Sequence, residues 1–178
     1  MKQPEVSFII PVYNMAATLP DALGPLLKIK GPKRFEIVII NDGSTDGVED
    51  VAKRFLSKLE RQDGISLKII SVDNAGRGAA RNLGIKEAHG KFICFLDADD
   101  SIVPDEFDRL WMCAENAPDS TEIIVGQFEI VGEENQLYAK RLLPAHIDKK
   151  WLLRHMALSA YSPVHLNAML IKRELFDR

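Results

Sequence analysis

Three carboxylates occur within four positions where an apolar stretch ends. Residues 92–101 read FICFLDADDS, in which Asp97, Asp99 and Asp100 close the run. Two carboxylates about 5 Å apart at an effective dielectric of ~20 repel by roughly 3 kcal/mol, so something has to compensate their charge. Basic side chains, helix N-termini or a bound cation are the candidates.

A divalent cation with oxygen ligands is the chemistry that two of these aspartates suggest. Side chains alternate along an extended chain, so Asp97 and Asp99 would point the same way. Mg2+ and Mn2+ typically take one or two protein carboxylates and complete their coordination with water and substrate phosphates. The spacing therefore predicts a metal–diphosphate site at Asp97 and Asp99, whereas Asp100 or Ser101 could instead cap a following helix.

Four apolar runs recur in the first hundred residues, and polar residues follow each of them. The runs are VSFIIPV (6–12), FEIVII (35–40), LKIISV (67–72) and KFICFL (91–96). Their Val, Ile and Phe content without strict alternation is typical of strands buried on both faces of a parallel sheet. Because ligands of open α/β sheets bind beyond the carboxyl ends of the strands, we expect the four polar ends to meet at one edge.

Helical patterns separate the four runs. Apolar residues recur at helical spacing over 19–27, 48–59 and 79–88, and Gly24 with Pro25 predicts a kink or break in the first of these. The order βαβαβαβ predicts a mostly parallel sheet with right-handed crossovers.

After Asp100 the pattern changes. Pro104 begins another helical pattern, residues 122–131 and 136–143 predict two antiparallel strands, residues 148–158 predict a helix, and residues 167–176 begin as a strand. The fold class is therefore α/β, a Rossmann-like sandwich with a mostly parallel central sheet and a smaller antiparallel element. The 178 residues, 46% of them hydrophobic, predict a single domain over 1–178.

The composition argues against several functional classes. The net charge is −3, so no global basic field would attract nucleic acid. No apolar stretch approaches the ~20 residues that a membrane span needs, and residues 1–14 lack the apolar run of a signal peptide. Cys94 and Cys113 make no disulfide framework, and Cys94 lies in an apolar run that predicts a buried thiol. A cytoplasmic protein fits these features best.

The segment NDGSTD (41–46) follows the second apolar run. Ser44, Thr45 and Asp46 are residue types that begin helices, so part of this segment could simply start the next helix. Asp42 precedes those residues and lies directly at the strand end, where we expect it to act as a ligand.

The segment NAGRGAARN (74–82) follows the third run. Gly76 and Gly78 permit close backbone approach, and Arg77 and Arg81 supply positive charge near the acidic loop. The two glycines form a partial dinucleotide fingerprint, which makes an NAD-type site a rival. Two features oppose it: Arg81 occupies the third glycine position, and the fingerprint belongs to the first strand–helix turn rather than the third.

The runs VSFIIPVYN, EIVIINDGSTDG and NAGRGAARNLGIKEAHGKFICFLDADD together closely resemble the family 2 glycosyltransferases, over roughly residues 5–112. The resemblance implies a GT-A fold and transfer of a sugar, with inversion, from a nucleotide-diphosphate sugar (a UDP-sugar) to an acceptor hydroxyl, with Mn2+ or Mg2+ as cofactor. It further implies that the nucleotide contacts Pro11, Tyr13, Asn14, Asp42, Asn74, Gly76, Arg81 and Asp97, and that Asp99, with Asp97, binds the metal.

The general base is the part that the resemblance leaves open. The family carries it in an acidic motif after a strand like NAMLIKRELF (167–176), and Glu174 does not sit in such a motif. We therefore expect the base beyond Arg178, a domain cut short on its acceptor side, and a fragment that binds the donor without turnover.

Three further expectations concern partners and rivals. The resemblance implies a saccharide or lipid-linked acceptor, bacterial cell-surface polysaccharide or glycolipid synthesis, and peripheral association with the inner membrane face.

The alternatives are a non-catalytic nucleotide-sugar binding module and a nucleotidyltransferase. The latter usually carries a Gly-rich basic loop after its first strand, where this chain has PVYNMAATL.

Overall fold

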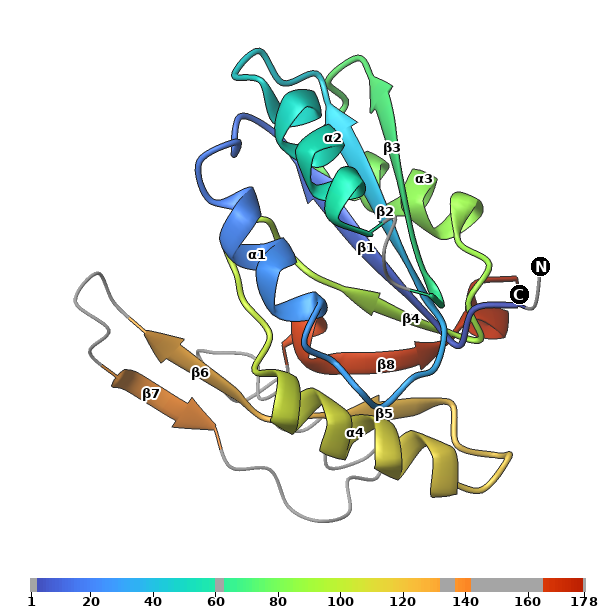
Figure 1. Cartoon of the computed structure of the whole chain (residues 1–178). Coiled ribbons are helices and arrows are strands. Elements are labelled where there is room, and N and C mark those ends of the chain that lie inside the picture. Colours follow the sequence, from blue (N-terminus) through green and yellow to red (C-terminus); the bar gives the residue numbers. More distant parts are fainter. Residues whose placement is uncertain (1–2, 60–62, 132–136, 142–164, 178) are drawn as a thin grey trace, which may run out of the picture.

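A six-stranded sheet forms the centre of the protein. The computed structural model describes residues 3–59, 63–131, 137–141 and 165–177 (Figure 1). The strands lie in the order β3 (Ile65–Val72), β2 (Phe35–Asp42), β1 (Val6–Val12), β4 (Phe92–Phe95), β8 (Met169–Lys172) and β5 (Ile123–Val125). The first four run parallel, and β8 is antiparallel to both β4 and β5. The expected mostly parallel sheet is confirmed.

Helices cover both faces of this sheet and make a three-layer sandwich (Figure 1). They are α1 (Leu19–Leu26), α2 (Val48–Leu59), α3 (Arg77–Glu87) and α4 (Pro104–Asn116), with short 3-10 helices η1 (Leu166–Ala168) and η2 (Arg173–Asp177). Helices α1, α2 and α4 share one hydrophobic core, and α3 packs on the opposite face. Helix α1 ends one residue after Pro25, where a break was expected.

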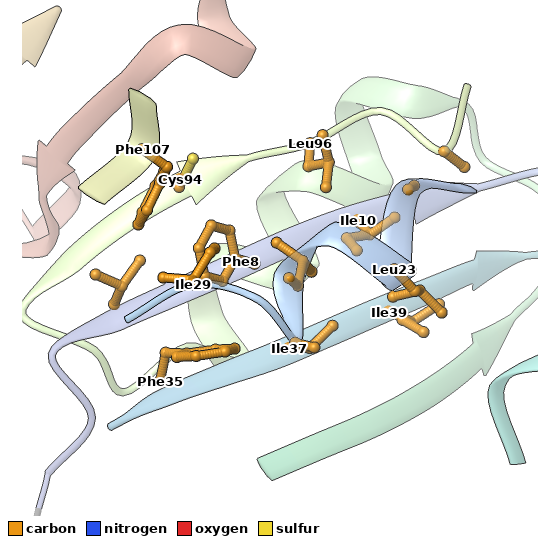
Figure 2. Close-up of a cluster of buried hydrophobic side chains, with 14 of the residues drawn as sticks. Phe8, Ile10, Leu23, Ile29, Phe35, Ile37, Ile39, Cys94, Leu96 and Phe107 are labelled. Carbon is orange, nitrogen blue, oxygen red and sulfur yellow. The ribbon is translucent and has the colours of Figure 1, made fainter. Parts of the chain in front are cut away.

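Strand β1 explains why the apolar runs lack alternation. Phe8 and Ile10 face the core beneath α1, α2 and α4 (Figure 2). Ile9 faces the opposite side of the sheet, where it contacts α3. All three side chains are fully buried. Each contributes about 1.5–3 kcal/mol by leaving water, so apolar residues are favoured at every position of a strand covered on both faces.

The expected strand over 122–131 is wrong as a single element. It divides at Gly126, whose N–H donates to the carbonyl of Ala168 at 2.7 Å. Residues before the glycine form β5 in the main sheet, and residues after it form β6 (Phe128–Val131), which pairs with β7 (Leu137–Arg141) in a separate antiparallel ribbon. The helix expected over 148–158 lies outside the described residues.

A buried carboxylate joins three segments at the amino ends of the strands. Glu36 at the start of β2 accepts hydrogen bonds from the Ser7 hydroxyl of β1, at 2.6 Å, and from the Gly90 N–H just before β4, at 3.1 Å. Charge-assisted bonds to a buried carboxylate are stronger than neutral ones. Glu36 therefore fixes the relative positions of β1, β2 and β4 at the end of the sheet opposite their polar loops.

Within the described ranges, no helix combines the length and the apolar character that crossing a membrane requires.

Two glycines of α3 provide a matched test of this packing. An added Cβ at Gly84 would lie 2.3 Å from the Cγ2 of Ile9, whereas one at Gly78 would meet no atom within 4 Å. We expect Gly84→Ala to lower the free energy of unfolding by about 1–3 kcal/mol, because an overpacked core forces shifts. Gly78→Ala should leave it unchanged or raise it by up to about 1 kcal/mol through helix propensity. Urea unfolding measures both, and equal effects would contradict the packing of α3 on β1.

The two thiols should differ in reactivity. Burial raises the pKa of the Cys94 thiol to about 12, while Cys113 on α4 is exposed. The thiolate is the reactive form, so at pH 8 a thiol reagent should label Cys113 in the native protein and Cys94 only after unfolding. Mass spectrometry of the labelled peptides distinguishes the two sites. Rapid native labelling of Cys94 would contradict the buried position of β4.

Candidate functional site

A cavity of about 310 Å³ lies at the carboxyl ends of the parallel strands. Its walls come from the ends of β1, β2 and β4, from the β3–α3 loop and from the first turn of α3. The lining residues are Pro11, Val12, Tyr13, Met15, Asp42, Asn74, Gly76, Arg77, Ala80, Asp97, Ala98 and Asp99. The polar strand ends thus meet at one edge, as the parallel topology led us to expect.

Most residues predicted to contact a nucleotide line this cavity, and two do not. Those that do are Pro11, Tyr13, Asp42, Asn74, Gly76 and Asp97, and Asp99, the predicted metal ligand, lines the cavity as well. Tyr13 is 51% exposed, so its ring is available to a ligand. Asn14 and Arg81 lie outside the lining, where Arg81 contacts the lining residue Asp97 and Asn14 binds Ser44 and Thr45. The nucleotide contacts themselves stay predictions.

Asp42 organises the β3–α3 loop. Its side chain, in a residue only 3% exposed, accepts the backbone N–H of Ala75 at 2.8 Å and that of Gly76 at 2.9 Å, one on each carboxylate oxygen. The Asn74 side-chain amide donates to the Asp42 backbone carbonyl at 2.9 Å. Gly43 lies so close to Asn74 that an added Cβ would meet the Asn74 nitrogen at 2.9 Å. The end of β2 therefore determines where this wall of the cavity lies.

The segment after Asp42 holds the loop that follows β1. The Ser44 hydroxyl accepts the Asn14 N–H at 3.0 Å, and the Asp46 carboxylate accepts the Ala16 N–H at 2.7 Å. Asn14, with φ of 51°, accepts the Thr45 N–H at 2.8 Å. The idea that these residues start the next helix is wrong, because Gly47 separates them from α2 and their side chains bind the neighbouring loop. Asn14 accordingly joins the loop after β1 to the segment after β2.

Two arginines of α3 neutralise Asp97. The Arg81 guanidinium lies 2.6 Å from one Asp97 oxygen, and the Arg77 guanidinium lies 3.6 Å from the other. Arg81 also lies over the Phe95 ring at 5.9 Å. Basic side chains were one of the candidates for compensating the acidic loop, and for Asp97 they are the ones present.

The acidic segment is a turn and not an extended chain. The Asp100 N–H donates to the Asp97 carbonyl at 3.0 Å, so the expectation that extended geometry aligns Asp97 with Asp99 is wrong. Both nevertheless line the cavity, together with Ala98 between them. Asp99 is exposed, and no other described residue gives its carboxylate a hydrogen bond or an ion pair.

Asp100 has a structural partner far away in the sequence. Its carboxylate accepts a hydrogen bond from the Asn167 amide of η1. Burial raises the pKa of Asp100, and the bond from Asn167 opposes that rise. Neither Asp100 nor Ser101 caps α4, whose N-cap residue is Val103 with no side-chain bond. That capping alternative is wrong, because Asp100 faces η1 and the Ser101 hydroxyl donates to the Asp21 carbonyl.

The carboxylates of the cavity fit a divalent cation that is coordinated partly by the protein and partly by a bound substrate. In the described part of the chain, no group of three or more His, Cys, Asp or Glu could hold a metal ion by itself. Asp99 offers a free carboxylate to the cavity, and Asp97 lies in the same wall. One or two carboxylates are what Mg2+ or Mn2+ takes when phosphates complete the coordination.

Sequence reasoning missed several residues of this site. Ala80 and Ala98 line the cavity, yet small apolar residues carry no chemical signal. Arg77 was recognised as a nearby charge but not as part of the cavity wall. Asn167 had no local signal, because its contact with Asp100 depends on how β8 pairs with β4.

The fold and the position of the cavity define an α/β protein of the GT-A type. A mannosyltransferase from Pyrobaculum calidifontis, in complex with GDP-Man and Mn2+, superposes with a TM-score of 0.66 at 20% identity, covering 100% of this chain and 47% of that one. S. aureus TarS superposes with a TM-score of 0.54 at 31% identity, over 62% of this chain and 20% of that one. TarS has also been solved in complex with UDP-GlcNAc.

The chain belongs to glycosyl transferase family 2, whose model matches residues 7–177. EpsH of Bacillus subtilis, whose own assignment as a glycosyltransferase is provisional, is 34% identical over 137 residues, which are 75% of this chain and 37% of that protein. A cholesterol galactosyltransferase of Borreliella burgdorferi is 34% identical over 144 residues, 79% of this chain and 37% of that protein. The chain thus spans about a third of the length of these relatives. The family excludes the NAD-type and nucleotidyltransferase rivals.

Hydrogen exchange tests whether the Asp42 carboxylate holds the Ala75 and Gly76 amides of the β3–α3 loop. We expect Asp42→Ala to speed exchange of the Ala75 and Gly76 amides by about tenfold or more, since each loses a charge-assisted hydrogen bond of roughly 1.5–3 kcal/mol. NMR or peptide-resolved mass spectrometry gives the rates. Asp73→Ala, which removes an exposed carboxylate from the same loop, should leave them unchanged. Unchanged protection in the Asp42 variant would show that the loop does not depend on this side chain.

Proposed function

We propose that this chain binds a UDP-sugar, and that the whole protein transfers the sugar to an acceptor hydroxyl with inversion at the anomeric carbon. The observation that carries the proposal is the cavity at the carboxyl edge of the sheet, which has Tyr13 and Asp42 on one side and the Asp97–Asp99 turn on the other. Family membership supports glycosyl transfer, and the TarS complex with UDP-GlcNAc supports a uridine nucleotide.

The cavity divides into regions of different chemistry. Tyr13 and Pro11 at the end of β1 present an exposed ring and an apolar surface, on which a nucleoside base can stack. The Asp42 oxygens keep lone pairs beyond the two that bind the loop, so they can accept a hydrogen bond from the uracil or the ribose. We place the nucleoside between these groups and the diphosphate toward Arg77 and Asp99.

Asp99, with Asp97 beside it, would hold the divalent cation. When bound, Mn2+ or Mg2+ would neutralise the charge that develops on the departing nucleotide diphosphate. Arg81 keeps Asp97 in position, and the turn closed between Asp97 and Asp100 presents Asp99.

The acceptor side of the proposal lies outside the described site. The hydroxyl would attack from the sugar face opposite the leaving nucleotide and transfer its proton to a carboxylate, which we assign to a segment beyond Arg178. Within η2, Asp177 pairs with Arg173 at 3.5 Å, and Glu174 is exposed. We further propose a cytoplasmic setting at the inner membrane face, in cell-surface polysaccharide or glycolipid synthesis.

Donor binding without turnover is the second candidate for the chain as it stands. It is favoured by the absence of an assigned base among the described residues. Incubating the chain with UDP-sugars and measuring free UDP separates this candidate from a hydrolase or transferase. The same assay on a longer gene product, with NMR of the anomeric proton of the product, tests the inverting course.

Calorimetric titration tests the donor and the metal together. We expect UDP to bind, and 1 mM MnCl2 to tighten its binding by about tenfold, which corresponds to ~1.4 kcal/mol. Asp99→Ala should abolish the tightening by Mn2+ while uridine binding persists. Asp105→Ala, at an exposed acidic position of α4, should behave as wild type. Tighter binding of GDP than of UDP would overturn the uridine assignment, and an unchanged Mn2+ effect in the Asp99 variant would overturn its role as a metal ligand.

A further inference from the structure

We propose that Arg77 exchanges its contact with Asp97 for the diphosphate of the donor, whereas Arg81 stays on Asp97 throughout. This inference rests on the proposed function, since it takes a nucleotide diphosphate as the ligand. It assigns Arg77 as a donor-binding residue and makes Asp97 available at the moment the donor arrives.

The two arginines differ in how closely they contact Asp97 and in how exposed their side chains are. The Arg81 side chain is 22% exposed, lies 2.6 Å from the carboxylate and covers the Phe95 ring. The Arg77 side chain is 64% exposed and lies 3.6 Å from the other oxygen. Exposed ion pairs of that length contribute little to stability, so Arg77 can leave Asp97 at small cost. Arg81, which is packed and close, cannot do so without losing both contacts.

Only one of the two arginines faces the ligand. Arg77 belongs to the cavity wall with Asp97 and Asp99, whereas Arg81 is not among the lining residues. Within the part of the chain that the structure describes, Arg77 is also the only basic residue that lines the cavity. A guanidinium binds phosphate oxygens through a planar fork of N–H donors, which suits the partner proposed here.

The negative charges of the cavity favour a positively charged side chain beside a bound diphosphate. Backbone N–H groups compensate the charge of Asp42, and Arg81 compensates that of Asp97. Asp99 has no hydrogen-bond or ion-pair partner among the described residues. A nucleotide diphosphate adds further negative charge to this wall, and without a cation the carboxylates would repel it. Arg77 supplies one positive charge that is already in place and already directed into the cavity.

The exchange also has a consequence for Asp97. When Arg77 turns to the diphosphate, the Asp97 oxygen that it contacted at 3.6 Å loses that partner. The oxygen then lies in the same wall as Asp99, free to accept a new cationic neighbour. Arg77 would thus couple arrival of the donor to the availability of the second carboxylate, while Arg81 prevents Asp97 from moving.

A series of ligands that differ only in phosphate number tests this inference. Uridine, UMP and UDP are titrated calorimetrically, in EDTA and without divalent metal, into wild type, Arg77→Ala and Lys86→Ala. Lys86 lies in the last turn of the same helix, so its removal changes the net charge equally, away from the cavity. We expect Arg77→Ala to weaken UDP binding about five- to tenfold, the loss of one exposed charged contact, and uridine binding less than twofold. Lys86→Ala should change neither.

The possible results separate the two proposals. If Arg77→Ala weakens uridine and UDP by the same factor, Arg77 only shapes the cavity, and the inference is overturned; unchanged UDP binding also overturns it. Wild-type protein that binds no UDP either in EDTA or with 1 mM MnCl2 would instead overturn the proposed function, and this inference with it. Thermal unfolding monitors the fold of each variant. If Arg77→Ala lowers the melting temperature, Arg77→Gln, which keeps the side-chain length, replaces it in the same titrations.

Discussion

The ion pair between Arg81 and Asp97 is the interaction on which the arrangement of the site depends. It joins helix α3 to the acidic turn after β4, two segments that both contribute residues to the cavity wall. Because Arg81 lies over Phe95 and is mostly covered, the pair is shielded from water and holds the turn in place. With Asp97 held by Arg81 and by this turn, Asp99 stands exposed at the cavity and Arg77 is the arginine that can exchange partners.

The rest of the fold serves to bring these two segments together. Gly84 lets α3 lie directly on Ile9 of β1, so the helix that carries both arginines has a defined depth against the sheet. Glu36 ties the starts of β1 and β2 to Gly90 in the segment before β4, which fixes the starts of the three strands relative to one another. Asp42 then fixes the loop that leads into α3. Buried contacts at the amino ends of the strands and between α3 and β1 thereby position the side chains that line the cavity at the carboxyl ends.

Several loop residues of this protein hold a neighbouring loop instead of lining the cavity. Ser44, Asp46 and Asn14 have residue types that would suit a helix start or a ligand, yet each binds the backbone of a neighbouring loop. Asp42 does both, since it lines the cavity and accepts two N–H groups. A binding edge made of four loops needs such contacts, because a loop without them would be too mobile to present a ligand-binding group.

The sequence by itself determined the alternation of strands and helices, the parallel sheet and the edge at which the polar ends meet. These features depend on local hydrophobic patterns and on the one direction in which parallel strands end. Only the tertiary structure decided that arginines of α3 neutralise Asp97, that Gly126 divides a continuous apolar segment between two sheets, and that Asn167 contacts Asp100. Those choices rest on contacts between residues far apart in the chain, where distance and burial, rather than residue type, select the partner.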